Sequence, residues 1–206
     1  MHVHIIYTGG TIGMVDSPHG LVPGADLEGW LDSLLAGTPL ARSVSVTSLA
    51  PLIDSSNATP LSWQAIVDDL RAHAAADPQT AFVILHGTDT MAYTSAALSY
   101  ALTDLSVPVV VTGSQLPLGE LGTDAAANVT GALKAATSGR LSGVALFFGH
   151  RLLAGNRVTK SSSWAFTGFE SPNAAPLATT GAPWQWAPST RGGAGWKDAA
   201  PYARHD

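Results

Sequence analysis

The stretch AFVILHGTDTM, residues 81–91, carries the pattern from which we predict the fold. Its first five residues are all apolar, as expected for a short strand that is buried on both faces of a sheet. A polar cluster at residues 86–90 follows, and a helical pattern begins at Met91. A buried strand that passes through a Gly/Thr/Asp loop into a helix is the repeating unit of a parallel α/β sheet.

The same alternation of apolar runs and helical patterns extends from residue 3 to residue 148. We predict strands at residues 3–7, 43–49, 81–85, 107–111 and 144–148. We predict helices at residues 27–35, at 91–102, at 125–137 and from Thr59-Pro60 to about Ala74. The chain is therefore expected to be α/β, with a single Rossmann-like domain whose mostly parallel sheet is flanked by helices.

We place this domain at residues 1–170 and expect an irregular C-terminal tail at residues 171–206. The tail is rich in proline and glycine, and tryptophans at 184, 186 and 196 stand among small residues. One interpretation is a loose or irregularly wrapped tail. The other is that the tryptophans dock on this subunit or on a neighbouring one.

Composition narrows the classes of function. The formal net charge is -5 and no basic run is present, which argues against a nucleic-acid partner. The absence of cysteine excludes disulfides and thiolate chemistry. We find no leader peptide and no stretch of membrane-spanning length, and we therefore expect a cytoplasmic protein with no membrane partner. With 46% hydrophobic and 12% charged residues, we also expect a homo-oligomer.

Four polar clusters follow predicted strands, where open parallel sheets bind their ligands. They are residues 8–13, 54–57, 86–90 and 112–115. The first lacks the spacing of dinucleotide-binding and phosphate-binding loops, and taken alone it is an ordinary glycine turn. We predict that all four clusters line one pocket.

A threonine hydroxyl needs a proton acceptor and oxyanion donors before it becomes a useful nucleophile. Thr88 and Asp89 are adjacent at a strand end, and Lys160 could complete a Thr-Lys-Asp relay with them. Lys160 considered alone would more simply be a solvated surface lysine. The hypothesis therefore depends on the three residues coming together.

The clusters, taken together, resemble the bacterial asparaginase family, and most closely its cytoplasmic type I branch. The resemblance covers roughly residues 3–175. It rests on YTGGTIGM at 7–14, DSS at 54–56, VILHGTDTMAYT at 83–94, VTGSQLP at 111–117 and GNRVTK at 155–160. One such motif is weak support, but the ordered set is specific.

The resemblance implies hydrolysis of L-asparagine to L-aspartate and ammonia, with Thr11 as the first nucleophile. It assigns Thr88, Asp89 and Lys160 to a second catalytic unit. It makes Ser55 and Ser56 holders of the substrate α-carboxylate, and Asp89 also a holder of the α-ammonium. The substrate-binding set that it implies is Gly10, Ser55, Ser56, Gly87 and Ser114. It implies neither a cofactor nor a metal, and His2 and His4 alone make a weak metal site.

Two departures from the family pattern affect these expectations. A loop tyrosine of the family, which helps to activate the first threonine, aligns with Leu21. The smaller second domain of the family, which contributes to a neighbouring active site, is expected to be absent, so we expect weaker affinity. Three alternatives stay open: an amidohydrolase that prefers glutamine or another small amide, a non-catalytic asparagine/aspartate-binding module or truncated remnant, and a subunit that supplies ammonia to a partner enzyme.

Overall fold

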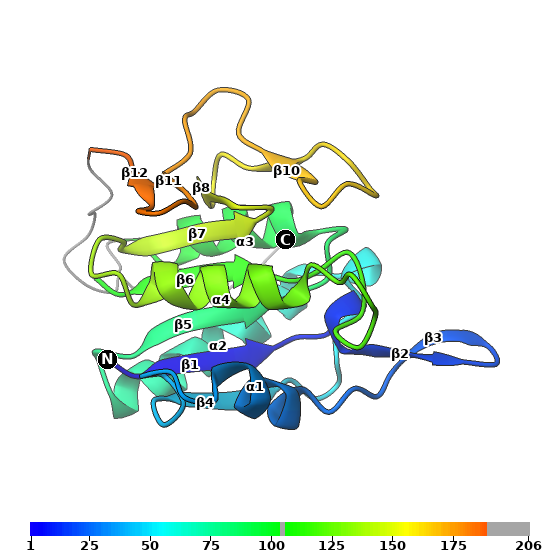
Figure 1. Ribbon diagram of the computed structural model, residues 1–206. Coiled ribbons are helices and arrows are strands. Elements are labelled where there is room, and N and C mark those ends of the chain that lie inside the picture. Colours follow the sequence, from blue (N-terminus) through cyan, green and yellow to red (C-terminus); the bar gives the residue numbers. More distant parts are fainter. Residues whose placement is uncertain (104–105, 189–206) are drawn as a thin grey trace, which may run out of the picture.

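The computed structural model describes residues 1–103 and 106–188, and these residues form the predicted α/β fold (Figure 1). Eight strands of this part of the chain make one sheet in the order β12-β11-β8-β7-β6-β5-β1-β4. The parallel strands are β1 (Val3–Tyr7), β4 (Val44–Ser48), β5 (Ala81–Leu85), β6 (Pro108–Thr112) and β7 (Gly143–Phe148). The antiparallel strands at the other edge are β8 (Arg151–Ala154), β11 (Ala178–Thr179) and β12 (Gln185–Trp186).

Helices cover both faces of the sheet (Figure 1). The helices α1 (Leu27–Leu35) and α4 (Ala125–Ala136) pack on one face, and α2 (Pro60–Ala76) and α3 (Met91–Ala101) pack on the other. Successive residues of a strand point to opposite faces, so both faces of the central strands need apolar side chains. None of the helices in residues 1–103 and 106–188 combines the length and the apolar character needed to cross a lipid bilayer.

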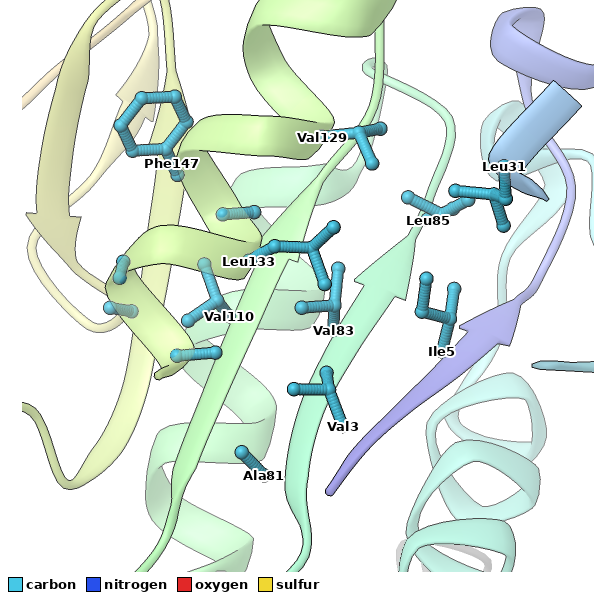
Figure 2. Packing of buried hydrophobic residues seen from close by; sticks show 14 of the residues in the cluster. Val3, Ile5, Leu31, Ala81, Val83, Leu85, Val110, Val129, Leu133 and Phe147 are labelled. Atoms are coloured by element: carbon cyan, nitrogen blue, oxygen red, sulfur yellow. The ribbon is translucent and has the colours of Figure 1, made fainter. Parts of the chain in front are cut away.

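The core under α4 shows how the sequence produces this layer packing (Figure 2). Val129 and Leu133 of α4 lie against Val83 and Val110 of the two central strands, and all four side chains are buried. Between them Gly131 brings the helix backbone so close to the Phe147 ring that a Cβ would overlap it. Small residues on the buried stripe of α4 therefore set how closely this helix approaches the sheet.

The predicted strands and helices are confirmed, with boundary shifts of one or two residues. The structure adds an antiparallel hairpin that the periodicity did not predict, formed by β2 (Met14–Ser17) and β3 (Gly20–Pro23). Figure 1 shows this hairpin extending away from the body of the domain. A second short antiparallel pair, β9 (Thr159–Lys160) and β10 (Phe169–Glu170), lies in the chain between β8 and β11.

Part of the predicted irregular tail is regular, because β11 and β12 continue the sheet. The Trp184 ring stacks on Phe147 with centroids 5.6 Å apart, and Trp186 stacks on Trp184 at the same distance. Lys134 and Arg140 lie over these two rings, each 5.2 Å from the ring centroid. Of the two interpretations of the tail, docking on the same subunit therefore holds for these two tryptophans. Trp196 lies outside the described residues, and the division at residue 170 stays a prediction.

Glycine backbones bring the first and third polar loops into contact. Gly10 has φ 95° and ψ 174°, a conformation that is essentially restricted to glycine. A Cβ on Gly10 would lie 2.5 Å from both Cα and N of Gly87. Only a residue without a side chain lets the loop after β1 pack directly on the loop after β5.

Gly10→Ala should therefore destabilise the fold. The backbone strain costs about 1–3 kcal/mol, and the overlap with Gly87 adds about 1–3 kcal/mol. Gly20→Ala is the matched control, because Gly20 also has a positive φ (100°) but a Cβ there would meet nothing within 4 Å. The loss should be measured by urea denaturation. Equal losses in the two variants would show that the contact with Gly87 is not tight.

Candidate active site

A pocket of about 250 Å³ opens where the loops after β1, β4, β5 and β6 meet. This is the carboxyl-terminal side of the parallel strands, where the ligand crevice of an open α/β sheet is expected. Of the predicted site residues, the pocket wall holds Gly10, Thr11, Ser55, Gly87, Thr88, Asp89 and Lys160. The wall also holds Met14, Asp54, Gln115 and Ser163.

The most specific feature of the pocket is the contact of Lys160 with two neighbours from the loop after β5. Lys160 Nζ lies 2.9 Å from Thr88 Oγ1 and 2.9 Å from Asp89 Oδ1. The Thr88 side chain is buried, and Lys160 is only 19% exposed. Asp89 is 62% exposed. The structure therefore brings together the hydroxyl, the lysine and the carboxylate that a Thr-Lys-Asp relay would need.

The fold holds Lys160 in place through its own short strand. β9 pairs with β10, with Lys160 opposite Phe169. Phe169 is fully buried, and its ring meets Phe148 of β7 edge to face with centroids 4.9 Å apart. The position of the ammonium group therefore depends on the packing of an aromatic pair beside the sheet, 72 residues along the chain from Thr88.

Thr11 begins a single 3-10 turn, Thr11–Gly13, directly after the glycine contact. Gly13 N donates to Gly10 O at 3.2 Å, which closes the turn. In the described part of the chain the Thr11 hydroxyl has no hydrogen-bond partner, whereas the Thr88 hydroxyl has Lys160. Thr11 therefore lines the pocket without a hydrogen-bonded acceptor among the described residues.

The loop after β4 brings one of the two predicted serines to the pocket. Ser55 is buried on the wall, where a Cβ on Gly87 would overlap its hydroxyl. Ser56 is exposed and not among the lining residues, because its hydroxyl and its amide both donate to Asp54 Oδ1, at 2.8 and 3.0 Å. These two bonds from Ser56 lower the pKa of Asp54 below its usual value, so that a second carboxylate lines the pocket as an anion.

At the end of β6 the structure brings a neighbour to the pocket instead of the predicted residue. Ser114 is buried and its hydroxyl donates to the Leu116 carbonyl, so it is not part of the wall. Gln115 takes that place, with Oε1 3.5 Å from Thr88 Oγ1 and Nε2 donating to Ala165 O at 3.0 Å. Gln115 belongs to the predicted polar cluster at residues 112–115, but the sequence did not show which side chain of this loop faces the pocket.

The Gln115 loop is held in place by Asp124, which was not among the predicted site residues. Its carboxylate accepts hydrogen bonds from the backbone amides of Gln115 and Leu116 at 3.0 to 3.2 Å. Asn128, one turn into α4, donates to the same carboxylate and to Gly113 O, each at 2.9 Å. The only available signal was an Asp at the position before a predicted helix, which usually indicates a cap.

Two other residues noted in the sequence lie off the pocket wall. His86 is buried, with Nδ1 2.8 Å from Gly87 O and Nε2 3.0 Å from Thr94 Oγ1, and its burial lowers its pKa. This agrees with a structural role for a neutral imidazole. Leu21 lies on β3 in the extended hairpin, 45% exposed and not among the lining residues.

The chain is similar to proteins of known structure and name. The family described as "Asparaginase, N-terminal" matches residues 2–190. L-asparaginase 1 of Escherichia coli strain K12 is 45% identical over 184 residues, which are 87% of this chain and 53% of that protein. The 60 kDa lysophospholipase of Mus musculus is 39% identical over 199 residues, covering 86% and 35%.

Among solved structures, L-asparaginase I of Vibrio cholerae aligns with a TM-score of 0.85 and 40% sequence identity. The alignment covers 97% of this chain and 61% of that one. The chain thus spans about half the length of the E. coli relative, and it matches the N-terminal domain of the family's proteins. On the extent of the family match, the identity and the shared fold, the chain belongs to the asparaginase family.

Proposed function

We propose that this chain hydrolyses the side-chain amide of L-asparagine to L-aspartate and ammonia, with threonine as the nucleophile. The observation that carries the proposal is the position of Lys160 Nζ, 2.9 Å from both Thr88 Oγ1 and Asp89 Oδ1, in a pocket that Thr11 also lines. Membership of the asparaginase family supports the same reaction.

The proposed reaction has two halves. The Thr11 oxygen forms a bond to the amide carbon, the C–N bond breaks, and the leaving nitrogen takes up a proton and departs as ammonia. Water then attacks the resulting ester and releases aspartate and the Thr11 hydroxyl. In this scheme the proton that leaves the Thr11 hydroxyl passes through Thr88 and Lys160 to the leaving nitrogen, and Asp89 orients the Lys160 side chain. Backbone N–H groups at the start of α3 stabilise the developing oxyanion.

The charges on the pocket wall suit a small zwitterion. Asp54 and Asp89 supply negative charge for an α-ammonium group, and the buried Ser55 hydroxyl lies on the same wall for an α-carboxylate. Ser56 and Ser114 would need to change their hydrogen bonds in order to reach such a substrate. We therefore assign substrate binding to Gly10, Ser55, Gly87 and Asp89, and add Gln115 beside the scissile amide.

Glutamine is the nearest competing substrate. It is longer than asparagine by one methylene, which separates two substrates by only about 1–3 kcal/mol. The name of the mouse relative points to a lipid substrate instead. Of the residues that line this pocket, Met14 is the one large apolar side chain, so the wall favours a polar substrate over an acyl chain.

A binding module without catalysis is the alternative from a different class. Such a module needs carboxylates and hydroxyls for recognition, but not a lysine in contact with a buried threonine. That contact is the specific reason to prefer an enzyme. Calorimetry that shows asparagine binding without ammonia release would favour the module, and release that requires an added enzyme would favour an ammonia-supplying subunit.

Removing either threonine hydroxyl should abolish most of the activity of the 206-residue chain. Thr11→Ala and Thr88→Ala should each lower kcat for ammonia release from L-asparagine by roughly 10² or more, because each removes a group that acts in the transition state. Thr11→Ser and Thr88→Ser are the matched controls, since they keep a hydroxyl. Near-normal rates in both alanine variants would exclude this mechanism.

The lysine contact gives a separate prediction. Lys160→Met should slow ammonia release by roughly 10² to 10⁴, the usual contribution of a positioned acid or base. Asp89→Asn should raise KM as well as lower kcat, because the carboxylate serves both the amine and the substrate ammonium. Lys134→Met removes a lysine that lies over Trp184, and its rate should match the parent. An unchanged KM in Asp89→Asn would point to Asp54 as the ammonium partner.

We further propose that the protein acts in the cytoplasm as a homo-oligomer. Tyr93 and Tyr100 stand two turns apart on α3, each 68% exposed, and Leu61 at the start of α2 is 64% exposed. Aromatic side chains exposed to this degree are typical of contact surfaces. Replacing both tyrosines by Ser should lower the molar mass measured by light scattering. A parent protein that is already a monomer would refute the oligomer.

A further inference from the structure

A polar cluster that the proposed reaction does not use lies between the sheet and α2. It consists of His4 on β1, Thr47 and Ser45 on the edge strand β4, and Asp69 and His73 on α2. The parallel strands run toward the catalytic pocket beyond Tyr7, so His4, the second residue of β1, lies toward the opposite end. Successive side chains of a strand point to opposite faces of the sheet. Val3 and Ile5 therefore pack with α1 and α4, while the His4 side chain points toward α2.

We propose that His4, Asp69 and His73 form a binding site for a divalent transition metal ion, with Zn²⁺ as its best-suited occupant. One ligand atom from each residue lies within 4.8 Å of the other two. Asp69 Oδ2 is 3.6 Å from His4 Nε2 and 3.5 Å from His73 Nδ1. A tetrahedral zinc ion with bonds of about 2.0–2.1 Å separates neighbouring ligand atoms by about 3.3 Å.

The ring of His4 is held in a fixed orientation by hydrogen bonds at both nitrogens. Its Nδ1 lies 2.7 Å from Ser45 Oγ, and that same hydroxyl lies 2.8 Å from His2 Nε2. With the proton on Nδ1, the Nε2 lone pair points toward Thr47 and Asp69. A metal-bound histidine usually donates its other ring N–H to a neighbouring acceptor in this manner.

Protonation does not block His4 at neutral pH. The side chain is only 1% exposed, and burial, followed by the nearby His73 and His2, lowers the pKa of His4 to about 4. A neutral imidazole is the form that binds a metal. Burial also raises the pKa of Asp69 while His73 opposes the rise, so a bound cation would favour the carboxylate that ligates it.

Thr47 can exchange its hydrogen bond with His4 for one with Asp69 when the ion binds. Its Oγ1 is 3.0 Å from His4 Nε2 and 3.4 Å from Asp69 Oδ2. When a metal occupies the Nε2 lone pair, the hydroxyl can turn to the carboxylate and orient it. Two contacts of His73 must also change: its Nδ1 lies 3.0 Å from Asp69 O, and its ring is stacked on that of His4 with centroids 3.5 Å apart and planes 17° from parallel.

The ligand types select the class of metal. Two imidazole nitrogens and one carboxylate oxygen suit Zn²⁺, Ni²⁺ or Cu²⁺ better than Mg²⁺ or Ca²⁺, which prefer oxygen ligands. Asp69 is 20% exposed and His73 is 34% exposed, so the ion has a path from solvent and water can take its remaining position. Bound there, zinc would join β1 to α2 and stabilise the fold.

The proposal should be tested on the tag-free 206-residue protein after treatment with a chelator. Competition with a zinc-sensitive dye measures affinity, Co²⁺ in place of zinc reports the ligand geometry by visible absorption, and the rise in Tm on adding Zn²⁺ measures stabilisation. We expect one bound ion and a higher Tm. Asp69→Asn and His73→Asn should each weaken zinc binding by about 10-fold or more and remove the rise in Tm.

Two controls separate this site from other sources of zinc binding. Asp68→Asn changes the neighbouring exposed carboxylate, which accepts a hydrogen bond from Gln64, and should leave the affinity unchanged. His2→Asn tests chelation by the chain terminus. Binding that is lost in His2→Asn but kept in Asp69→Asn would overturn the proposal. So would the absence of binding in the parent, which would leave the cluster as a hydrogen-bonded histidine pair.

Discussion

The close approach of two glycine backbones is the constraint on which the candidate active-site pocket depends. Because Gly10 and Gly87 carry no Cβ, the turn that bears Thr11 lies directly on the loop that bears Thr88. Gly9 allows a similar close contact with the loop after β4, because a Cβ on Gly9 would overlap the Ile53 carbonyl. In the same contact, Ile53 N donates to Thr8 O at 2.6 Å. The loops after three neighbouring strands thus contact one another through their backbones. Because of these contacts, the side chains of the three loops face one cavity.

The pocket combines this close-packed main chain with polar side chains that are positioned by residues outside the pocket. Lys160 comes from β9 and is positioned by the buried Phe169, while Gln115 is positioned by Asp124 and Asn128 at the start of α4. Preorganised groups of this kind do not have to be ordered again during the reaction. The asymmetry between the two threonines follows from the same architecture. Thr88 contacts the Lys160 side chain, whereas the Thr11 hydroxyl lines the same pocket and makes no hydrogen bond to the described residues.

Periodicity predicted the parts of the fold that depend on local pattern. Continuous apolar runs such as residues 81–85 are buried on both faces and were recognised as strands, and Thr59-Pro60 marked the start of α2. The hairpin of β2 and β3 has no apolar face to reveal it, since Leu21 and Val22 are both exposed. β11 and β12 are two residues each, and they are strands only because β8 offers an edge for pairing.

The same distinction between local and long-range information applies to the two sites. Ordered motifs placed Thr11, Thr88, Asp89 and Lys160 on one wall, but they did not show that Ser114 turns inward and that Gln115 takes its place. At the other end of β1, His2 and His4 are too few for a metal site. Asp69 and His73 join His4 from a helix whose register against the sheet is set by the apolar contacts of Ile66 and Leu70. A buried His4 where the strand pattern calls for an apolar residue was the one local sign, because a buried polar group needs partners and these lie on other elements.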